Sequence, residues 1–109
     1  MSAKASRRQQ EYMLRLYIAE NTPQSAIALE NLQRLCDAHL AGRYHLEVID
    51  LMKNPELAKA DQILAVPTLV RKMPTPIRKF IGTLSDTTRV LVDFALPGHE
   101  AAVSEVAKG

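Results

Sequence analysis

The chain contains no tryptophan, few other aromatic residues and only one cysteine, Cys36, among its 109 residues. A single cysteine cannot form a disulfide within the chain, and it cannot supply the Cys-x-x-Cys pair that thiol–disulfide exchange uses. The composition therefore suits a reducing, cytoplasmic environment. An enzyme that uses the Cys36 thiol, such as a transferase or oxidoreductase, stays as an alternative. The residue lies, however, on the apolar stripe of a predicted helix, where cysteine usually fills the core.

Charge and long apolar runs are also scarce. The formal net charge is only +2, and the basic residues form no stripe, so binding of nucleic acid through bulk charge is not expected. The apolar runs are too short to cross a bilayer, so no membrane association is expected. The four glycines are isolated, which excludes a glycine-rich phosphate loop, and the three histidines lack the spacing of metal ligands. We therefore expect no catalytic residue, no metal and no other cofactor, and we interpret four aspartates as caps or solvated charges: Asp50, Asp61, Asp86 and Asp93.

The length suits one compact domain. Residues 1–11 are polar and basic, and we expect them to form a flexible arm. Residues 98–109 are rich in alanine and charge, and we expect a flexible tail there. The predicted domain spans residues 12–97.

The first half of the domain has the pattern of a strand, a helix and a second strand. Residues 12–18 are nearly all apolar, which is typical of a strand covered on both faces. Thr22 and Pro23 mark a helix start, and Gly42 is a plausible stop. Residues 44–50 alternate as a second strand does, so the two strands should be parallel. The buried stripe of the helix is predicted at Ala28, Leu29, Leu32, Leu35, Cys36 and Leu40.

The second half continues with a short helix over 55–64 after Asn54, strands over 65–70 and 77–81, and a last helix over 86–96 capped by Ser85. The predicted fold class is α/β, and the order βαβαββα is the thioredoxin topology. Pro67 stands where thioredoxin-like folds place a cis-proline.

Residues 87–94 fit two patterns. Val90, Val92 and Phe94 recur at the period of a strand, whereas Val90, Leu91, Phe94 and Ala95 recur at that of a helix. The segment is therefore either an ordinary amphipathic helix or a segment with two competing conformations.

Four basic residues flank the Pro-Thr-Pro turn at 74–76, two on each side, and would form a local basic patch on a hairpin: Arg71, Lys72, Arg78 and Lys79. Such charges can protect a sheet edge from aggregation. They can equally form a docking patch for an acidic surface.

Several ordered motifs resemble the KaiB family. They are YMLRLYIA at 12–19, NTPQS at 21–25, VID at 48–50, KNPELA at 53–58, DQILAVPTL at 61–69 and PTPIRKFIGTLS at 74–85. The resemblance runs over 12–96. It implies a non-enzymatic clock adaptor that binds and regulates a KaiC-like hexameric ATPase, with a KaiA-like protein or a sensor kinase as further partners. It also implies two folds: a self-associated ground state, a dimer or homotetramer with a different C-terminal half, and a fold-switched, thioredoxin-like monomer.

The resemblance also suggests site residues. The candidate partner-binding residues are Lys53, Lys59, Arg71, Lys72, Arg78 and Lys79. The candidate fold-switch segment comprises Gly82, Ser85, Asp86, Val90, Val92, Asp93, Phe94 and Ala95.

This chain departs from the family at several positions. Glu20 and Asp93 replace glycines, and Ala95 replaces an aspartate. Glu47 and Gln62 replace lysines implicated in docking to KaiC, and a charge reversal at an interface is costly. The alternative function is therefore a thioredoxin-like interaction protein in stress signalling, independent of a KaiC ATPase.

Overall fold

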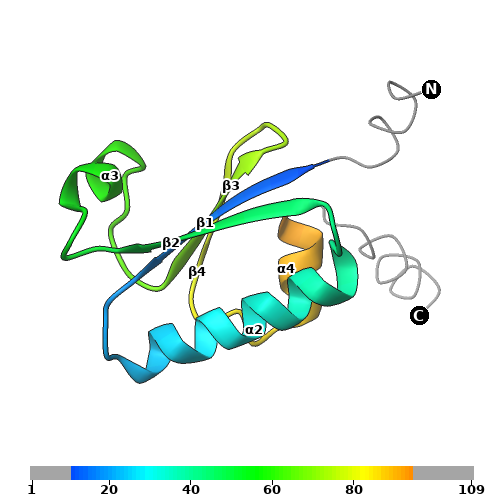
Figure 1. Cartoon of the computed structure of the whole chain (residues 1–109), viewed down its shortest axis with the longest axis horizontal. Helices are drawn as coiled ribbons and strands as arrows, with labels where there is room; N and C mark the ends of the chain where they lie inside the picture. The colour runs from blue at the N-terminus through cyan, green and yellow to red at the C-terminus, as the bar shows by residue number, and fades with distance from the viewer. Residues whose placement is uncertain (1–10, 95–109) are drawn as a thin grey trace.

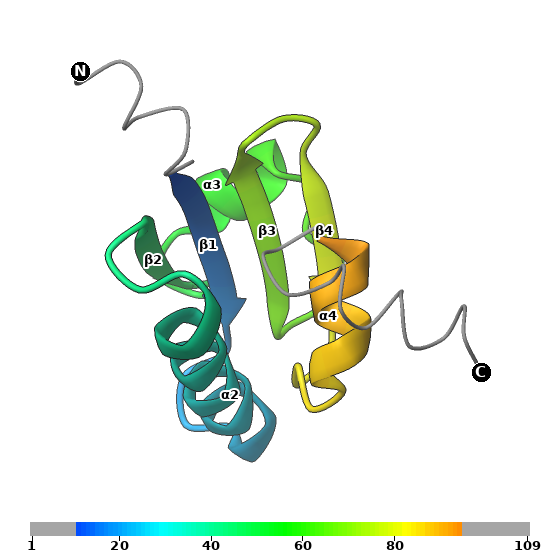
Figure 2. The ribbon, with the colours of Figure 1, turned by 90° about the vertical axis from the view of Figure 1, so that its right-hand side faces the viewer.

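The computed structural model describes residues 11–94, which form a four-stranded sheet with helices on both faces (Figures 1 and 2). The predicted order βαβαββα is confirmed. Most of the predicted arm, the predicted tail, residues 95–97 of the predicted domain and the fold-switch candidate Ala95 lie outside the described residues. The elements are β1 (Tyr12–Ile18), α2 (Pro23–His39), β2 (Tyr44–Asp50), α3 (Pro55–Ala60), β3 (Thr68–Met73), β4 (Arg78–Ile81) and α4 (Thr87–Asp93).

The strands lie in the order β2-β1-β3-β4. Strands β1 and β2 are parallel, as the strand–helix–strand pattern predicted, and Leu14 pairs with Leu46. Strand β3 runs antiparallel to both β1 and β4. Strand β1 lies inside the sheet, between β2 and β3, so its side chains face the helices on both faces of the sheet. This position explains the nearly continuous apolar sequence of β1.

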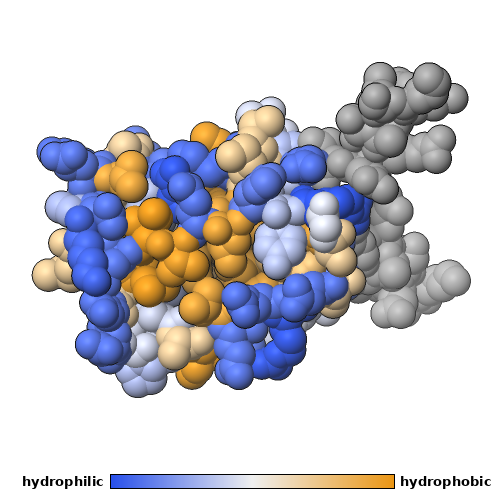
Figure 3. All heavy atoms as spheres, in the orientation of Figure 1, coloured by the Kyte–Doolittle hydropathy of each residue, from blue (hydrophilic) through white to orange (hydrophobic). Residues whose placement is uncertain are grey.

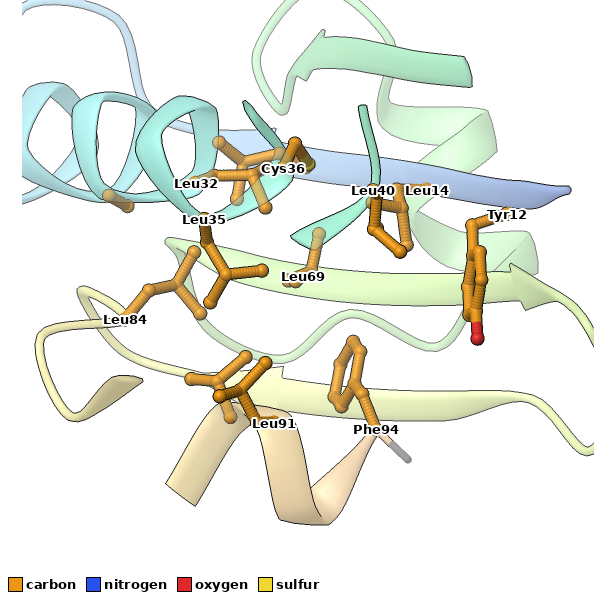
Figure 4. Packing of buried hydrophobic residues seen from close by; sticks show 13 residues of the cluster. Tyr12, Leu14, Leu32, Leu35, Cys36, Leu40, Leu69, Leu84, Leu91 and Phe94 are labelled. Carbon is orange, nitrogen blue, oxygen red and sulfur yellow. The ribbon is translucent and has the colours of Figure 1, made fainter. Parts of the chain in front are cut away.

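The main core fills the space between the sheet and helices α2 and α4 (Figure 4). Leu14 and Leu16 of β1 pack there against Leu32 of α2, and Phe94 closes the far end. Cys36 is fully buried in this cluster. Burial raises the pKa of the Cys36 thiol to about 12, so the thiolate that any cysteine chemistry needs is scarce at neutral pH.

A smaller cluster lies on the opposite face of the sheet, beneath α3. Its buried members are Tyr17 of β1, Ala58 of α3 and Val70 of β3. Only Ala58 of α3 is buried, so this helix is held to the sheet by few apolar contacts.

The predicted helix starts are partly confirmed. Thr22 caps α2 and accepts a hydrogen bond from the Ser25 amide at 3.4 Å, with Pro23 in the first turn. Ser85 as the cap of α4 is wrong, because the Asp86 carboxylate accepts from the Arg89 amide at 3.2 Å instead. Leu84 has a positive φ of 64°, which turns the chain and places the helix start one residue later than predicted.

Helix α3 ends earlier than predicted. The Ile63 amide donates to the Ala58 carbonyl at 2.9 Å, and the Gln62 amide donates to the Lys59 carbonyl at 3.0 Å. Gln62 has φ 57°. These are the two bonds of a Schellman motif, which normally places glycine in the left-handed position. Glutamine there gave the sequence no stop signal, so the predicted end at residue 64 was wrong.

The peptide bond between Val66 and Pro67 is cis, and so are the bonds before Pro74 and Pro76. Residues 87–93 are helical, with Val90 and Leu91 buried and Val92 turned outward.

Candidate partner-binding surface

The start of α2, where redox thioredoxins carry their cysteines, is occupied by hydroxyl side chains that hold the turn. The Thr22 hydroxyl donates to the Ala19 carbonyl at 2.8 Å. The Ser25 hydroxyl accepts from the Ala19 amide at 3.0 Å. Both hydroxyls therefore form hydrogen bonds with the Ala19 backbone between β1 and α2. These two side chains have a structural role in the turn.

An apolar hollow of about 660 Å³ lies beside α3. Its rim includes Leu64, which is 95% exposed, and Met52, which is 80% exposed. Figure 3 shows hydrophobic residues gathered in the middle of one face of the molecule, with hydrophilic residues around them. Large exposed apolar side chains usually mark a surface that another molecule covers. The hollow is lined by Leu51, Met52, Pro55, Ala58, Lys59, Gln62, Ile63 and Leu64.

A cluster of charged side chains lies next to this hollow and centres on Asp61, the residue that ends α3. Arg15 Nη1 lies 3.0 Å from Asp61 Oδ2, and Lys72 Nζ lies 2.7 Å from Oδ1. The Tyr17 hydroxyl donates to Oδ2 at 2.6 Å. Arg15 Nε also donates to Glu47 Oε1 at 2.9 Å. Strands β1, β2 and β3 each contribute at least one partner, and we call these five residues the Asp61 cluster.

The contacts around Asp61 favour the ionised form of its carboxyl group. Burial alone would raise the pKa of Asp61, but hydrogen bonds from Lys72, Tyr17 and Arg15 outweigh burial and hold that pKa below its ordinary value. The pKa of Arg15 is raised, first by its hydrogen bond to Tyr17 and then by Glu47 and Asp61. Two carboxylates thus face two cations, and the cluster as a whole is neutral.

The four basic residues around the Pro-Thr-Pro turn do not form the single patch predicted from the sequence. Arg71 pairs with Arg78 across the hairpin, and Val70 pairs with Lys79. Because side chains alternate along a strand, Arg71 and Arg78 point to the α4 side, and Lys72 and Lys79 point to the α3 side. The four residues therefore form two pairs, the arginines on the α4 face of the sheet and the lysines on the α3 face.

Arg71 is buried and only 3% exposed. Its guanidinium donates to the Phe94 carbonyl and, at 2.7 Å, to the Pro76 carbonyl. Its Nε has no hydrogen-bond partner within residues 11–94. Burial, followed by the nearby charge of Arg78, lowers the pKa of Arg71. In this conformation Arg71 supports the end of α4 and cannot reach a partner.

The other candidates lie on the surface or in the Asp61 cluster. Lys59 lines the hollow, and Lys79 Nζ donates to the Gln62 carbonyl at 3.3 Å. Lys53 lies 3.5 Å from Glu20 in an exposed ion pair. Lys72 binds Asp61, and Arg78 is exposed. The structure thus places Lys59 in the lining of the hollow and Lys79 against Gln62, another lining residue.

Arg15 and Tyr17 are site residues that were not expected from the sequence, and Asp61, expected to be an ordinary cap or solvated charge, lies at the centre of their cluster. One signal was present, because Arg15 is the only charge in an otherwise apolar strand. A charge at such a position needs a partner from elsewhere in the fold.

The KaiB domain family model matches residues 15–94. The chain belongs to the KaiB family. The circadian clock oscillator protein KaiB of Cyanothece sp. is 48% identical over 94 residues, which cover 86% of this chain and 90% of that protein. The KaiB of Acaryochloris marina is 51% identical over 85 residues, which cover 78% and 82%.

Solved structures of lower identity share the thioredoxin-like fold. The N-terminal domain of Synechococcus elongatus SasA matches with a TM-score of 0.62 and 24% identity, over 72% of this chain and 75% of that one. Mitochondrial thioredoxin 3 from Saccharomyces cerevisiae matches with a TM-score of 0.58 and 19% identity, over 75% and 76%. These likenesses concern the fold alone.

Residues 11–94 contain no group of three or more histidine, cysteine, aspartate or glutamate side chains arranged to hold a metal ion. Within the same range, none of the helices has the length and apolar character to cross a membrane.

Proposed function

We propose that this protein is a non-catalytic, cytoplasmic clock adaptor that binds and regulates a KaiC-like hexameric ATPase through the hollow beside α3. The observation that carries the proposal is the exposed apolar rim of that hollow, formed by Leu64 and Met52. Membership of a family whose named relatives are circadian clock oscillator proteins supports the clock role.

The hollow has the character of a binding surface. Apolar side chains that become buried on binding supply most of the affinity, and charges at the rim select the partner and steer its approach. Lys59 lies in the lining and Lys79 beside it. The partner segment should therefore combine an apolar side chain with at least one carboxylate. Lys53 and Arg78 are outer contacts, and Lys72 and Arg71 act from within the fold.

We further propose that the described fold is the binding-competent monomer, and that a self-associated dimer or tetramer with a rearranged C-terminal half is its alternative. Support comes from α4, which has only seven residues and a sequence that also fits a strand. Gly82 and the segment through Asp93 and Phe94 would change conformation. A KaiA-like protein or a sensor kinase would compete for the same complex.

A second function is favoured by one observation. Glu47 and Gln62 stand where the resemblance to the KaiB family implies lysines. Both lie on the α3 side of the sheet, Gln62 in the hollow itself. A partner other than a KaiC-like ATPase would explain both replacements. The second candidate is therefore an interaction protein of stress signalling that uses the same surface.

The test mixes the protein with the KaiC-like ATPase of its own genome and ATP, and measures the mass of the complex by size exclusion with light scattering. We expect a slowly forming complex. Leu64→Ser and Lys59→Glu should each weaken it by about tenfold or more. Arg34→Glu, an equal charge reversal on α2, is the matched control. If no complex forms within a day, the stress-signalling candidate replaces the adaptor.

The proposed conformational exchange has its own measurement. Amide NMR spectra recorded over a range of protein concentrations should contain two sets of signals for the C-terminal half, and their ratio should change with concentration. A single set of signals at every concentration, with no minor state in exchange experiments, would refute the second fold.

A further inference from the structure

The hollow depends on a very short helix. Most of its lining comes from α3 and the residues that follow it, from Ala58 to Leu64. Helix α3 has six residues, and an isolated helix of that length is not stable in water. Contacts from outside the helix must therefore hold this wall of the hollow in place.

The apolar contacts of α3 are too few to do this alone. Ala58 is its one buried residue. At its start, the Asn54 side chain makes no capping hydrogen bond within the described range and instead donates to the Asp50 carbonyl. Polar links to the sheet lie at the Leu57 carbonyl, which is 2.9 Å from the Tyr17 hydroxyl, and at the other end of the helix, where Asp61 meets Arg15, Tyr17 and Lys72.

The position of Asp61 in the helix is itself unfavourable. A carboxylate at the C-terminal end of a helix is repelled by the helix dipole. The Asp61 side chain is also only 10% exposed, and a buried charge is costly without partners. Its value to the fold must therefore come from the donors that bind it, all of which lie on the sheet.

We infer that Asp61 is a positioning residue for the partner-binding hollow, and that Arg15 and Lys72 are the anchors that fix it to the sheet. The carboxylate ties Asp61, which directly follows the last residue of α3, to β1 and β3. Gln62, Ile63 and Leu64 follow directly, so their placement in the hollow follows from that of Asp61. This inference deepens the proposed function and rests on it for the binding measurement, but not for the structural one.

Amide hydrogen exchange distinguishes an ion pair that only stabilises the fold from a residue that positions the hollow. Loss of a stabilising pair lowers the protection of all slowly exchanging amides together. Loss of a positioning residue opens α3 locally and leaves β1 and α2 protected. Hydrogen exchange of the Asp61, Gln62 and Ile63 amides reports on this directly, because all three donate to carbonyls of α3.

The experiment compares Asp61→Asn and Lys72→Met with Glu30→Gln. Glu30 lies 3.9 Å from Arg34 in an exposed ion pair on α2, so its amide variant removes a carboxylate far from the hollow. Lys72→Met keeps most of the side-chain stem and two of the three donors to Asp61, so it folds even if Asp61→Asn does not. Lys72→Arg should restore wild-type behaviour because it keeps the charge.

We expect the three amides to exchange about tenfold faster or more in Asp61→Asn and Lys72→Met, with little change in β1 and α2. Binding of the KaiC-like ATPase should weaken to a similar extent, and Glu30→Gln should behave as wild type. Equal acceleration across the whole chain, or unchanged exchange at the three amides, would overturn the inference. If the wild-type protein does not bind the ATPase, the proposed function fails, and the exchange measurement alone decides the role of Asp61.

Discussion

The two faces of the sheet differ in the residues that attach their helices. On the α2 and α4 side, the described contacts are mainly apolar, with Leu32, Leu69 and Phe94 fully buried. On the α3 side, the buried cluster within residues 11–94 has three members, with partly buried apolar residues packed against it, and charged groups around Asp61 add a second link. The first face can supply most of the stability of the fold. The second keeps apolar residues such as Leu64 exposed, and its helix is held by ion pairs and hydrogen bonds together with a small apolar cluster.

The largest expected effect on the free energy of unfolding comes from comparing a leucine-to-alanine substitution on each face of the sheet. Leu32→Ala should lower the free energy of unfolding by about 2–5 kcal/mol, because Leu32 is fully buried and its removal leaves a cavity. Leu64→Ala should change it by no more than about 0.5 kcal/mol, because the residue is 95% exposed. Urea denaturation measures both. A Leu64 variant as unstable as the Leu32 variant would mean that the hollow is closed in solution.

A second prediction compares the two arginines that pair across the β3–β4 hairpin. Arg71→Met should destabilise the fold by about 1–3 kcal/mol, because it leaves the buried Phe94 carbonyl and the part-buried contact to the Pro76 carbonyl without their donor. Arg78→Met should have an effect below about 0.5 kcal/mol, because Arg78 is exposed.

Urea denaturation again measures the difference, and Arg71→Lys should recover only part of it since lysine lacks the forked geometry. Equal effects at the two positions would show that Arg71 is not buried against α4 in solution.

The sequence predicted the apolar side of this molecule better than the charged one. Local patterns were enough for β1, for the Thr22 cap and for the parallel pairing of β1 and β2. The Asp61 cluster could not be predicted, because its partners are distant: Arg15 lies 46 positions from Asp61 and Lys72 lies 11.

The end of α3 and the start of α4 were mispredicted for a different reason. Gln62 and Leu84 adopt positive φ angles that their residue types rarely choose. Only the tertiary contacts around them can favour such conformations. By contrast, the placement of the turn arginines and lysines on opposite faces follows from the alternation of side chains along a strand, and could have been predicted from the sequence.

A third prediction concerns pH. The pKa of Asp61 in the folded protein lies below its ordinary value. The Asp61 carboxylate of the unfolded chain therefore binds a proton more tightly than that of the folded protein. The stability that ionised Asp61 contributes is therefore complete above the unfolded pKa and is lost as the pH falls through the folded pKa.

The free energy of unfolding, measured from about pH 6 to about pH 2, should fall more steeply for the wild type than for Asp61→Asn. The other carboxylates are present in both proteins, so their effects cancel in the difference. Parallel curves would mean that Asp61 is not bound by its donors in solution.

Substitution of Glu47 is expected to change stability little, and it bears most directly on the partner. Its side chain is 60% exposed, and its ion pair with Arg15 is only partly buried, so Glu47→Gln should cost no more than about 1 kcal/mol. Glu47→Lys introduces the lysine that the resemblance to the KaiB family implies at this position, and Arg15 keeps Asp61 as its remaining partner. If a KaiC-like ATPase is the partner, the Glu47→Lys, Gln62→Lys double variant will bind the ATPase of a cyanobacterial relative more tightly than wild type. The wild type will still bind its own ATPase more tightly than the double variant does. Unchanged binding to both ATPases would mean that these positions do not select the partner, and the case for the stress-signalling function would lose its main support.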